Sequence, residues 1–594
     1  MRFVQEATIV TILVWSGVSS TLAQMPMLRL PSPTSAPSQY QTRQGNFGFT
    51  RLPPVAQAIA TQAPIHGQPI TNVPLADASG WWEHHVGEPQ RPSAESVGVT
   101  ATELIAQALA QSEHVLAISQ GPLIQQENVL KAIADFDPSV FLESRWDDLS
   151  NPVGNTLTTG GPNRFSDHHW QNKGGFRKKT NLGGTIELSQ AIGLQDTNSI
   201  FFVPGQQAQT RMMLGLNQPL LRRAGREYNE SGILLAEIQT NIAEHELSRD
   251  LQDHAYTVIQ AYWDLYLHRA LYLQRQRSYD QAEKILIELK SREQIDSLRS
   301  QIARAQAAVA IRKAGVQRAM LETQTAQARI VTLTNNPYWR NGAAVELTPV
   351  EAPATTRAAI DLHTAFQTAL HYRPEVAKHM EEIREAQIRF GISKNELLPT
   401  LDLVLETYVA GLQGSYDVAN SIGNQFANGA PSYSAGIIFQ VPIGNRAAQA
   451  EYRRREAQVS QLMHELNAVL SQVSLEVEVA VNEVEATYQE LQGRYESMLA
   501  TDEELKYLFD RWRLLPGEDR AVSFVLEELL DAQDRQTEAE AAYVRSQVAY
   551  TIANFSLQRA SGALLHFGQP LSFEAAGEVV SAPVGEAPAF GTAP

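Results

Sequence analysis

Cysteine is absent from the 594 residues of the chain. Its absence excludes disulfide bonds, thiolate metal sites and a thiol nucleophile. It also excludes a lipid anchor on an N-terminal cysteine. If exported, such a chain would need neither disulfides nor reduction.

Long hydrophobic runs are also missing, except near the N-terminus. Arg2 precedes an apolar run from Ala7 to Val18, which the small-residue sequence TLA follows. This pattern predicts a cleaved signal peptide over residues 1–23. No later stretch reaches the about 20 uncharged residues that a membrane-spanning helix needs. Any part of the mature chain inside a membrane must therefore consist of strands.

Positive charge is scarce, because 48 Lys and Arg residues stand against 65 Asp and Glu residues and give a net charge of -17. This balance argues against nucleic acid as a partner. The sequence also has no phosphate-cradling glycine loop, no GxSxG elbow and no HExxH motif. We therefore predict no catalytic or cofactor-binding residue and do not expect an enzyme.

Two histidine pairs, His84-His85 and His168-His169, raise the question of a metal site. Adjacent histidines point in different directions in regular structure, and neither pair has a spaced third ligand. We interpret both pairs as loop surface and predict no metal.

Apolar periodicity is missing from both ends of the mature chain. Residues 24–95 are rich in Pro, Gln, Ser and Ala, and residues 574–594 have the same character. Such segments bury too little apolar surface to offset the entropy of ordering. We predict a disordered leader and a disordered tail.

Between these ends the sequence repeats itself. Ala108 in ATELIAQALAQ aligns with Ala369 in LHTAFQTALHY, an offset of 261 (369 minus 108). Pro138 aligns with Pro399 at the same offset (399 minus 138). Two landmarks in one register indicate an internal duplication.

Further along, Pro219 aligns with Pro442 at an offset of 223 (442 minus 219). The first copy therefore holds 38 more residues between its two prolines (261 minus 223). We assign the first copy to residues 96–345 and the second copy to residues 346–573, and interpret the extra residues as a loop insertion.

Each copy contains two extended segments with an apolar and a polar face. Leu401, Leu403 and Leu405 alternate with Asp402 and Glu406, for example. This alternation suits a tilted membrane strand of about 9 to 11 residues, although each segment alone also fits an ordinary sandwich strand. The three other such segments lie around Val140, Met212 and Ile437, and a less certain one covers residues 181–192, which we expect to extend the first hairpin outside the membrane.

Very long helices follow each strand pair. From about residue 226 to 289, and again in the second copy, apolar residues step by three or four. Partner helices are expected over 296–333 and 525–563. A helix of about 60 residues is roughly 90 Å long, so four helices must pack side by side as a coiled-coil array.

Pro219 and Pro442 occupy the points where strand gives way to helix. Proline ends a strand ladder and is tolerated at a helix start. Either proline alone could be a simple breaker, but their matched placement predicts a swivel between strands and helices.

Together these segments resemble the TolC family of outer-membrane efflux proteins over about residues 100–570. The resemblance implies a homotrimer whose subunits each add four strands to one barrel. It also implies a periplasmic helical tunnel that docks onto an adaptor and an inner-membrane pump. The motifs that carry the resemblance are LNQPLLRRAGR (216–226), HYRPEVA (371–377), LLPTLDL (397–403), FQVPIGNR (439–446) and ELLDAQDRQTEAEAAYVRSQVAYTIANFSLQRASGALL (528–565).

The expected fold is mostly α with a β-barrel part, TolC-like, with an internal duplication and a trimeric α/β barrel. Bacterial barrels need at least eight strands, so four strands per chain require several chains. The expected location is the outer membrane, in contact with its lipid, with the helices in the periplasm.

In the family, acidic side chains near the start of the returning helices ring the periplasmic aperture. By position, the resemblance assigns this role to Asp296, Glu528 and Asp531, which would attract cations. Ordinary solvated acids are the alternative. Phe524 occupies a position that is basic in some relatives, so a salt-bridge latch is not carried over.

The predicted function is the exit duct of a tripartite efflux or type I secretion system. The alternative is a periplasmic or envelope coiled-coil adaptor or scaffold without a pore. A scaffold would leave the alternating segments with two polar faces, which they lack. The transported substrate stays open between drugs, metal ions and polypeptides.

Overall fold

The computed structural model describes residues 80–91, 95–292, 299–340, 345–428, 430–514 and 520–565. All of them belong to the second of two units, Pro69–Pro594. The predicted signal peptide, the leader as far as residue 79 and the predicted tail lie outside the described residues. Within these residues, no helix is long and apolar enough to cross a membrane.

Matching helices begin the two copies. Helix α4 (Ala101–Gln111) starts behind a capping box made by Thr100, and α11 (Leu362–Tyr372) starts behind an Asp361 cap. The two helices begin 261 residues apart (362 minus 101), which is the offset of the predicted repeat. They continue into α5 (Glu113–Ile118) and α6 (Gln120–Ala134) in the first copy and into α12 (Pro374–Glu396) in the second.

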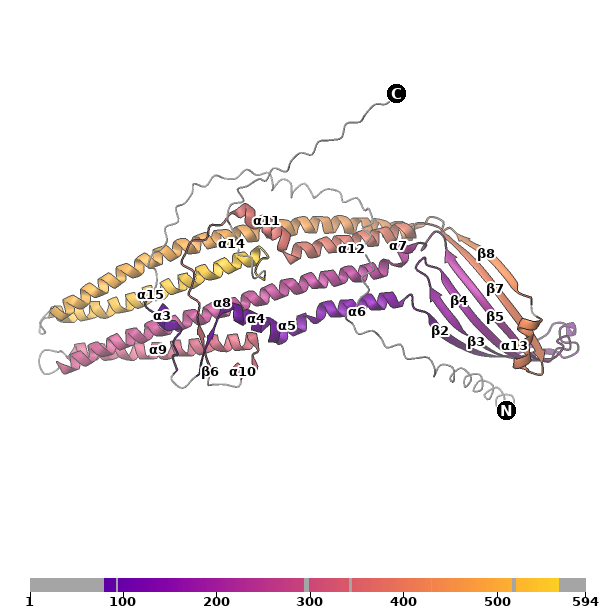
Figure 1. Ribbon diagram of the computed structural model, residues 1–594, viewed down its shortest axis with the longest axis horizontal. Helices are drawn as coiled ribbons and strands as arrows, with labels where there is room; N and C mark the ends of the chain where they lie inside the picture. The colour runs from indigo at the N-terminus through magenta and orange to yellow at the C-terminus, as the bar shows by residue number, and fades with distance from the viewer. Residues whose placement is uncertain are drawn as a thin grey trace, which may run out of the picture. The chain divides into compact units, whose positions relative to one another are not determined.

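Four long helices carry most of the buried core, as the sequence predicts. Helices α8 (Ser231–Ser291) and α14 (Arg446–Leu514) have 61 and 69 residues, which makes them about 90 to 100 Å long. Helix α9 (Arg299–Thr334) returns along α8, and α15 (Arg520–Ala560) returns along α14 (Figure 1). Apolar residues of α8, α14 and α15 share one core cluster, among them Tyr262, Leu265, Val477, Val484, Tyr543 and Val548.

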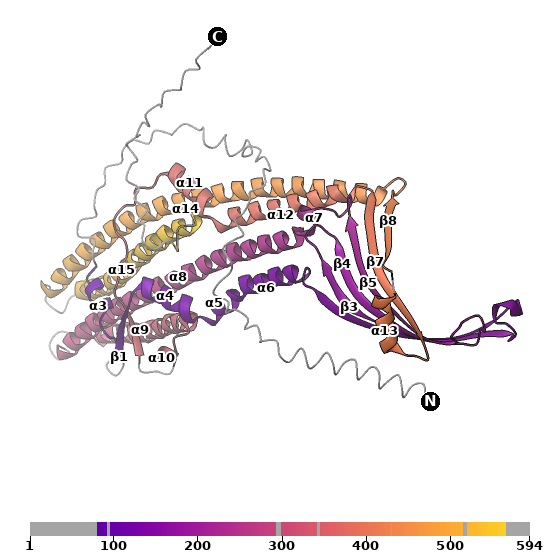
Figure 2. The same cartoon turned by 45° about the vertical axis from the view of Figure 1, so that its right-hand side comes forward.

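The main sheet is antiparallel and has six strands in the order β2-β3-β4-β5-β7-β8 (Figure 1). Figure 2 shows β4, β5, β7 and β8 from another side. Its strands are β2 (Ser139–Pro152), β3 (Arg164–Lys179), β4 (Thr185–Thr197), β5 (Gln206–Pro219), β7 (Thr400–Gly414) and β8 (Ser432–Gln440). The sheet therefore has two strands more than the four membrane strands expected: β3 was not expected, and β4 overlaps the less certain segment 181–192. The insertion in the first copy is not a loop, because it supplies the hairpin β3–β4.

The sequence pattern explains why β3 escaped prediction. Strand β3 reads RFSDHHWQNKGGFRKK, in which charged and polar residues occupy both alternating sets. Its neighbours on both sides supply the hydrogen bonds that hold it extended. Tertiary pairing therefore decides the conformation of β3 more than its own alternation does.

Smaller elements complete the fold. Strands β1 (Glu95–Val99) and β6 (Val345–Pro349), which lie at the start of the two copies, pair in parallel. Helix α13 (Val418–Ala427) lies on the sheet, where the sequence suggested a loop. The remaining elements are α3 (Glu83–Val86), η1 (Thr156–Thr158), α7 (Arg226–Asn229) and α10 (Pro337–Arg340).

Both prolines lie at strand-to-helix junctions. Pro219 is the last residue of β5, and Pro442 follows the end of β8 by two residues. Gly225 and Gly444 then adopt φ angles of 96° and 84°, which suit glycine, in the short connections just before a helix starts. The positions agree with the prediction, and the swivel itself stays a prediction.

The predicted leader ends too late. Residues 80–91 are described and packed, and the Trp82 side chain is 0 % exposed. The sequence analysis did not predict the packing of Trp81 and Trp82, because they lie among polar residues in a Pro-rich and Gln-rich stretch.

Candidate functional site

The six-stranded sheet has two chemically different faces. Directly opposed residues of antiparallel strands point to the same side, so the register assigns each side chain to a face. One register row crosses all six strands through Val140, Phe176, Leu188, Leu214, Thr407 and Tyr433. The neighbouring row points the other way, through Ser139, Arg177, Glu187, Gly215, Glu406 and Ser434.

The first face, which we call the apolar face, exposes large hydrophobic side chains on every strand. Val140 and Leu142 of β2 are 74 % and 63 % exposed, and Tyr433 and Ile437 of β8 are 78 % and 69 % exposed. Exposure of a continuous set of this kind marks a surface that meets apolar material. Other exposed members are Trp146, Phe176, Ile186, Leu188, Leu214, Leu405 and Phe439.

The opposite face, which we call the charged face, carries most of the ionised groups of the sheet. Glu187 receives hydrogen bonds from Lys173 at 2.7 Å and from Arg177 at 2.8 Å. The guanidinium of Arg211 lies 3.6 Å from the centre of the Tyr408 ring. Both signs of charge are present, on Glu143, Arg145, Asp147, Asp167, Lys173, Arg177, Glu187, Arg211, Asp402 and Glu406.

Helix α13 covers part of the apolar face with its polar side. The Ser421 hydroxyl lies 3.1 Å from the Thr210 hydroxyl and donates to the Ala208 carbonyl, while Gln425 pairs with Gln190. Phe426 on the same helix is 62 % exposed. The helix therefore points its polar side inward and an aromatic ring outward, the reverse of a helix in water.

At the far end of the helices, Glu528 and Asp531 lie on α15. Glu528 is half-buried, 4.0 Å from Arg511 of α14, and its Oε2 accepts no hydrogen bond from the described residues. Asp531 is exposed. Hydrogen bonding to Glu504, and then the charges of Asp531 and Glu528, raise the pKa of the Arg535 guanidinium. Asp296 lies outside the described residues.

A buried arginine connects the two helical hairpins, α8–α9 and α14–α15, near these acids. Arg312 of α9 is 8 % exposed and reaches α15, where it donates to the Gln533 side chain and the Leu530 carbonyl. It also bonds the Ser278 carbonyl of α8 and lies 2.8 Å from Asp534. Arg304 of α9 forms a further ion pair with Glu527 of α15. The sequence analysis missed both ties, because an arginine in a long helix has no distinctive local pattern.

Solved structures have a similar overall fold. A membrane protein from Pseudomonas aeruginosa matches with a TM-score of 0.58 at 16 % identity, over 80 % of this chain and 92 % of that chain. The CmeC outer membrane channel of Campylobacter jejuni matches with a TM-score of 0.55 at 12 % identity, over 78 % and 86 %. The outer membrane protein VceC of Vibrio cholerae matches with a TM-score of 0.54 at 14 % identity, over 78 % and 96 %. The chain has an outer-membrane channel fold.

The TolC-like fold expected from the motifs is thereby confirmed. No protein-family model matches the sequence, and no curated protein matches it either. The likeness therefore concerns the backbone architecture, which survives at identities where sequence comparison finds nothing.

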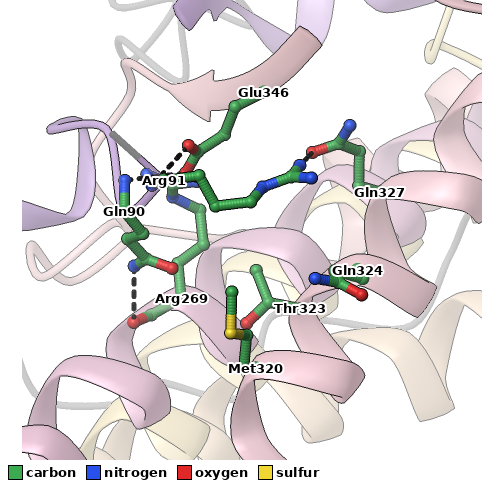
Figure 3. Close-up of a pocket in the computed structure, with 8 residues that line it drawn as sticks. All are labelled: Gln90, Arg91, Arg269, Met320, Thr323, Gln324, Gln327 and Glu346. Carbon is green, nitrogen blue, oxygen red and sulfur yellow. Dashed lines mark hydrogen bonds and ion pairs between the residues drawn. The ribbon is translucent and has the colours of Figure 1, made fainter. Parts of the chain in front are cut away.

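Within this channel fold, a buried ion pair anchors the segment that precedes β1. Arg269 of α8 is 0 % exposed and lies 2.6 Å from Glu346 of β6 (Figure 3). Its guanidinium also donates to the carbonyls of Val86 and Glu88. Burial raises the pKa of Glu346, but the N–H groups of Gln90 and Arg91 and the charge of Arg269 outweigh burial and hold it below its ordinary value.

The space beside this pair is not a ligand site. Its volume is about 10 Å³, which is room for no more than a water molecule. Gln327 and Thr323 of α9 line it together with Arg269 (Figure 3). We interpret the pair as a structural clamp.

A second contact of the same segment involves a titratable group. The Trp81 indole N–H donates to Glu540 of α15 at 3.1 Å, and Arg277 of α8 lies 3.5 Å from the same carboxylate. Burial raises the pKa of Glu540 to about 6, against the lowering effects of Trp81 and Arg277. The segment therefore joins both hairpins of the channel fold.

The histidine pairs do not lie in loops. His168 and His169 are consecutive residues of β3 and point to opposite faces, and His84 and His85 lie in α3. His168 lies 3.0 Å from Asp148, and His85 lies 3.1 Å from Glu88. Among the described residues, no group of three or more side chains could hold a metal ion.

Proposed function

We propose that the chain is the subunit of an outer-membrane channel, a passive exit duct coupled to a periplasmic adaptor and an inner-membrane pump. The observation that carries this proposal is the two-faced sheet. An exposed apolar face opposite a charged face suits a wall between lipid and a water-filled lumen. The neighbouring structures named as outer-membrane channels support the same assignment.

The sheet edges support a homotrimer. Strands β2 and β8 lie at the two edges of the sheet, and each can pair with a neighbouring chain. Backbone groups in lipid must be paired, so a subunit in the membrane needs neighbours that close the sheet. Exposed apolar residues on the helices also favour neighbours, notably Leu123 and Leu130 of α6 and Leu475 and Val479 of α14.

The acidic groups near the start of α15 are candidate gate residues. Threefold symmetry would gather Glu528 and Asp531 into rings, and Asp296 precedes α9 in the matching place. Arg511 offsets part of the charge of Glu528. Such rings would attract cations and repel one another when the aperture closes.

Fractionation tests the proposal. The detergent-extracted full chain should be a trimer that stays in the outer-membrane fraction. An adaptor or scaffold without a pore would leave the apolar face without lipid contact. A soluble periplasmic monomer would contradict the channel assignment.

Electrical recording tests the gate. We expect the double variant Glu528→Ala with Asp531→Ala to change cation block or conductance of the closed pore. Glu538→Ala is the matched control, because Glu538 is exposed on the same helix and pairs with Arg545. Unchanged currents in the double variant would remove the gate assignment and leave the channel proposal standing.

A further inference from the structure

The inserted hairpin lies inside the main sheet. In the second copy, β7 and β8 pair directly. In the first copy, β3 and β4 separate the equivalent strands β2 and β5. An insertion at the membrane end of a channel could equally form a loop above the wall.

Pairing along whole strands argues that the hairpin belongs to the wall. Strand β3 pairs with β2 from Ser139↔Arg177 to Pro152↔Arg164. It pairs with β4 from Lys179↔Thr185 to Asp167↔Thr197. Strand β4 pairs with β5 in one unbroken register, from Thr185↔Asn217 to Asp196↔Gln206. The hairpin is thus part of the same hydrogen-bonded surface as the other four strands.

The side chains of β4 follow the two faces of the sheet, and β3 adds Phe176 to the apolar face although polar residues occupy both of its sides. Phe176 and Leu188 lie on the apolar face, whereas Lys173, Arg177 and Glu187 lie on the charged face. Phe176 is 57 % exposed and Leu188 is 37 % exposed, so neither is covered by the chain itself. A loop in water would not need an exposed apolar face.

Strand direction permits closure with the hairpin included. Directions alternate across the six strands, so β2 and β8 run in opposite directions. The β8 edge of one copy can therefore pair antiparallel with the β2 edge of the next. Two inserted strands preserve this alternation, whereas a single inserted strand would break it.

We infer that β3 and β4 are wall strands, so that three copies close a barrel of eighteen strands (three times six). This inference rests on the proposed trimeric channel. Four strands per subunit would give twelve. With strands about 4.8 Å apart and tilted by about 40°, the backbone radius is about 18 Å for eighteen strands and about 12 Å for twelve. The wider lumen would admit bulkier solutes than a twelve-stranded exit.

Electron cryo-microscopy of the detergent-extracted full chain tests the strand count. We expect a trimer whose barrel has eighteen strands. A trimer with twelve wall strands and the β3–β4 hairpin outside would overturn this inference and leave the channel proposal intact. A monomer without a barrel would overturn the channel proposal itself.

Cysteine labelling in outer membranes gives a second test, because the native chain has no cysteine. Ala191→Cys on the charged face should react with a charged, membrane-impermeant thiol reagent. Leu188→Cys on the apolar face should be protected, as should the reference variant Leu214→Cys on β5. Reaction of Leu188→Cys together with protection of Leu214→Cys would place the hairpin outside the membrane and overturn the inference.

Discussion

At the scale of single residues, the buried Arg269–Glu346 pair fixes the segment before β1 to α8. Breaking such a pair leaves one charge uncompensated, which costs about 3–5 kcal/mol of unfolding free energy. We expect Arg269→Met to destabilise the protein by this amount, as measured by denaturant unfolding followed by tryptophan fluorescence. Arg275→Met, six residues along the same helix and exposed, is the control. Equal stability of both variants would show that the pair is not a clamp.

Glu540 gives a pH-dependent residue-scale prediction. Its pKa rises from an ordinary 4.5 to about 6 on folding. The folded chain therefore binds this proton more tightly than the unfolded chain does, which stabilises the folded state. This stabilisation is full below pH 4.5 and is lost as the pH rises through 6. A shift of this size corresponds to about 2 kcal/mol.

We expect Glu540→Gln to be more stable than the native chain at pH 7.5, by up to about 2 kcal/mol, since glutamine keeps an acceptor for Trp81. Below pH 4.5 the two proteins should be equally stable. The apparent melting temperature across pH 4 to 8 measures this. A constant difference at all pH values would show that Glu540 ionisation is not the cause.

At the scale of elements, Arg312 connects α9 with α15 and so opposes separation of the two hairpins. We expect Arg312→Ala to raise the frequency or size of channel openings in planar bilayers, because Gln533 and the Leu530 carbonyl lose their donor. Lys313→Ala, at the adjacent exposed position, should behave as the native chain. Identical currents in both variants would show that this tie does not restrain the pore.

Helices and strands with a strong period of hydrophobic residues were predictable from the sequence. The long helices and the strands around Val140, Met212, Leu403 and Ile437 were found because one face of each is apolar. Strand β3 was not found, because its conformation depends on pairing with β2 and β4.

The local contacts that bring distant residues together also could not be predicted. Arg269 and Glu346 lie 77 residues apart in the chain, and Trp81 and Glu540 lie 459 apart. Nothing in the local sequence marks these partners, because burial depends on how the helices pack. The assignment of Glu528 and Asp531 came from family position and stays a prediction.

At the scale of the whole molecule, the sheet exposes a large continuous apolar surface of a kind that water-soluble proteins avoid. The apolar face of the sheet is exposed across all six strands, while the helices bury a continuous core. This distribution is explained if lipid covers one face of the sheet and further copies of the chain cover its edges. The placement of hydrophobic groups therefore supports the proposed channel, and the neighbouring structures share its fold.

Single-channel recording tests this account most directly. The purified full chain, reconstituted into a planar lipid bilayer, should insert as a trimer and give discrete steps of ion current. In the proposed channel the charged face of the sheet lines the lumen and carries both signs of charge, so the conducting barrel should pass both cations and anions. Insertion of the trimer without any current, or failure of the protein to enter the bilayer, would contradict the account.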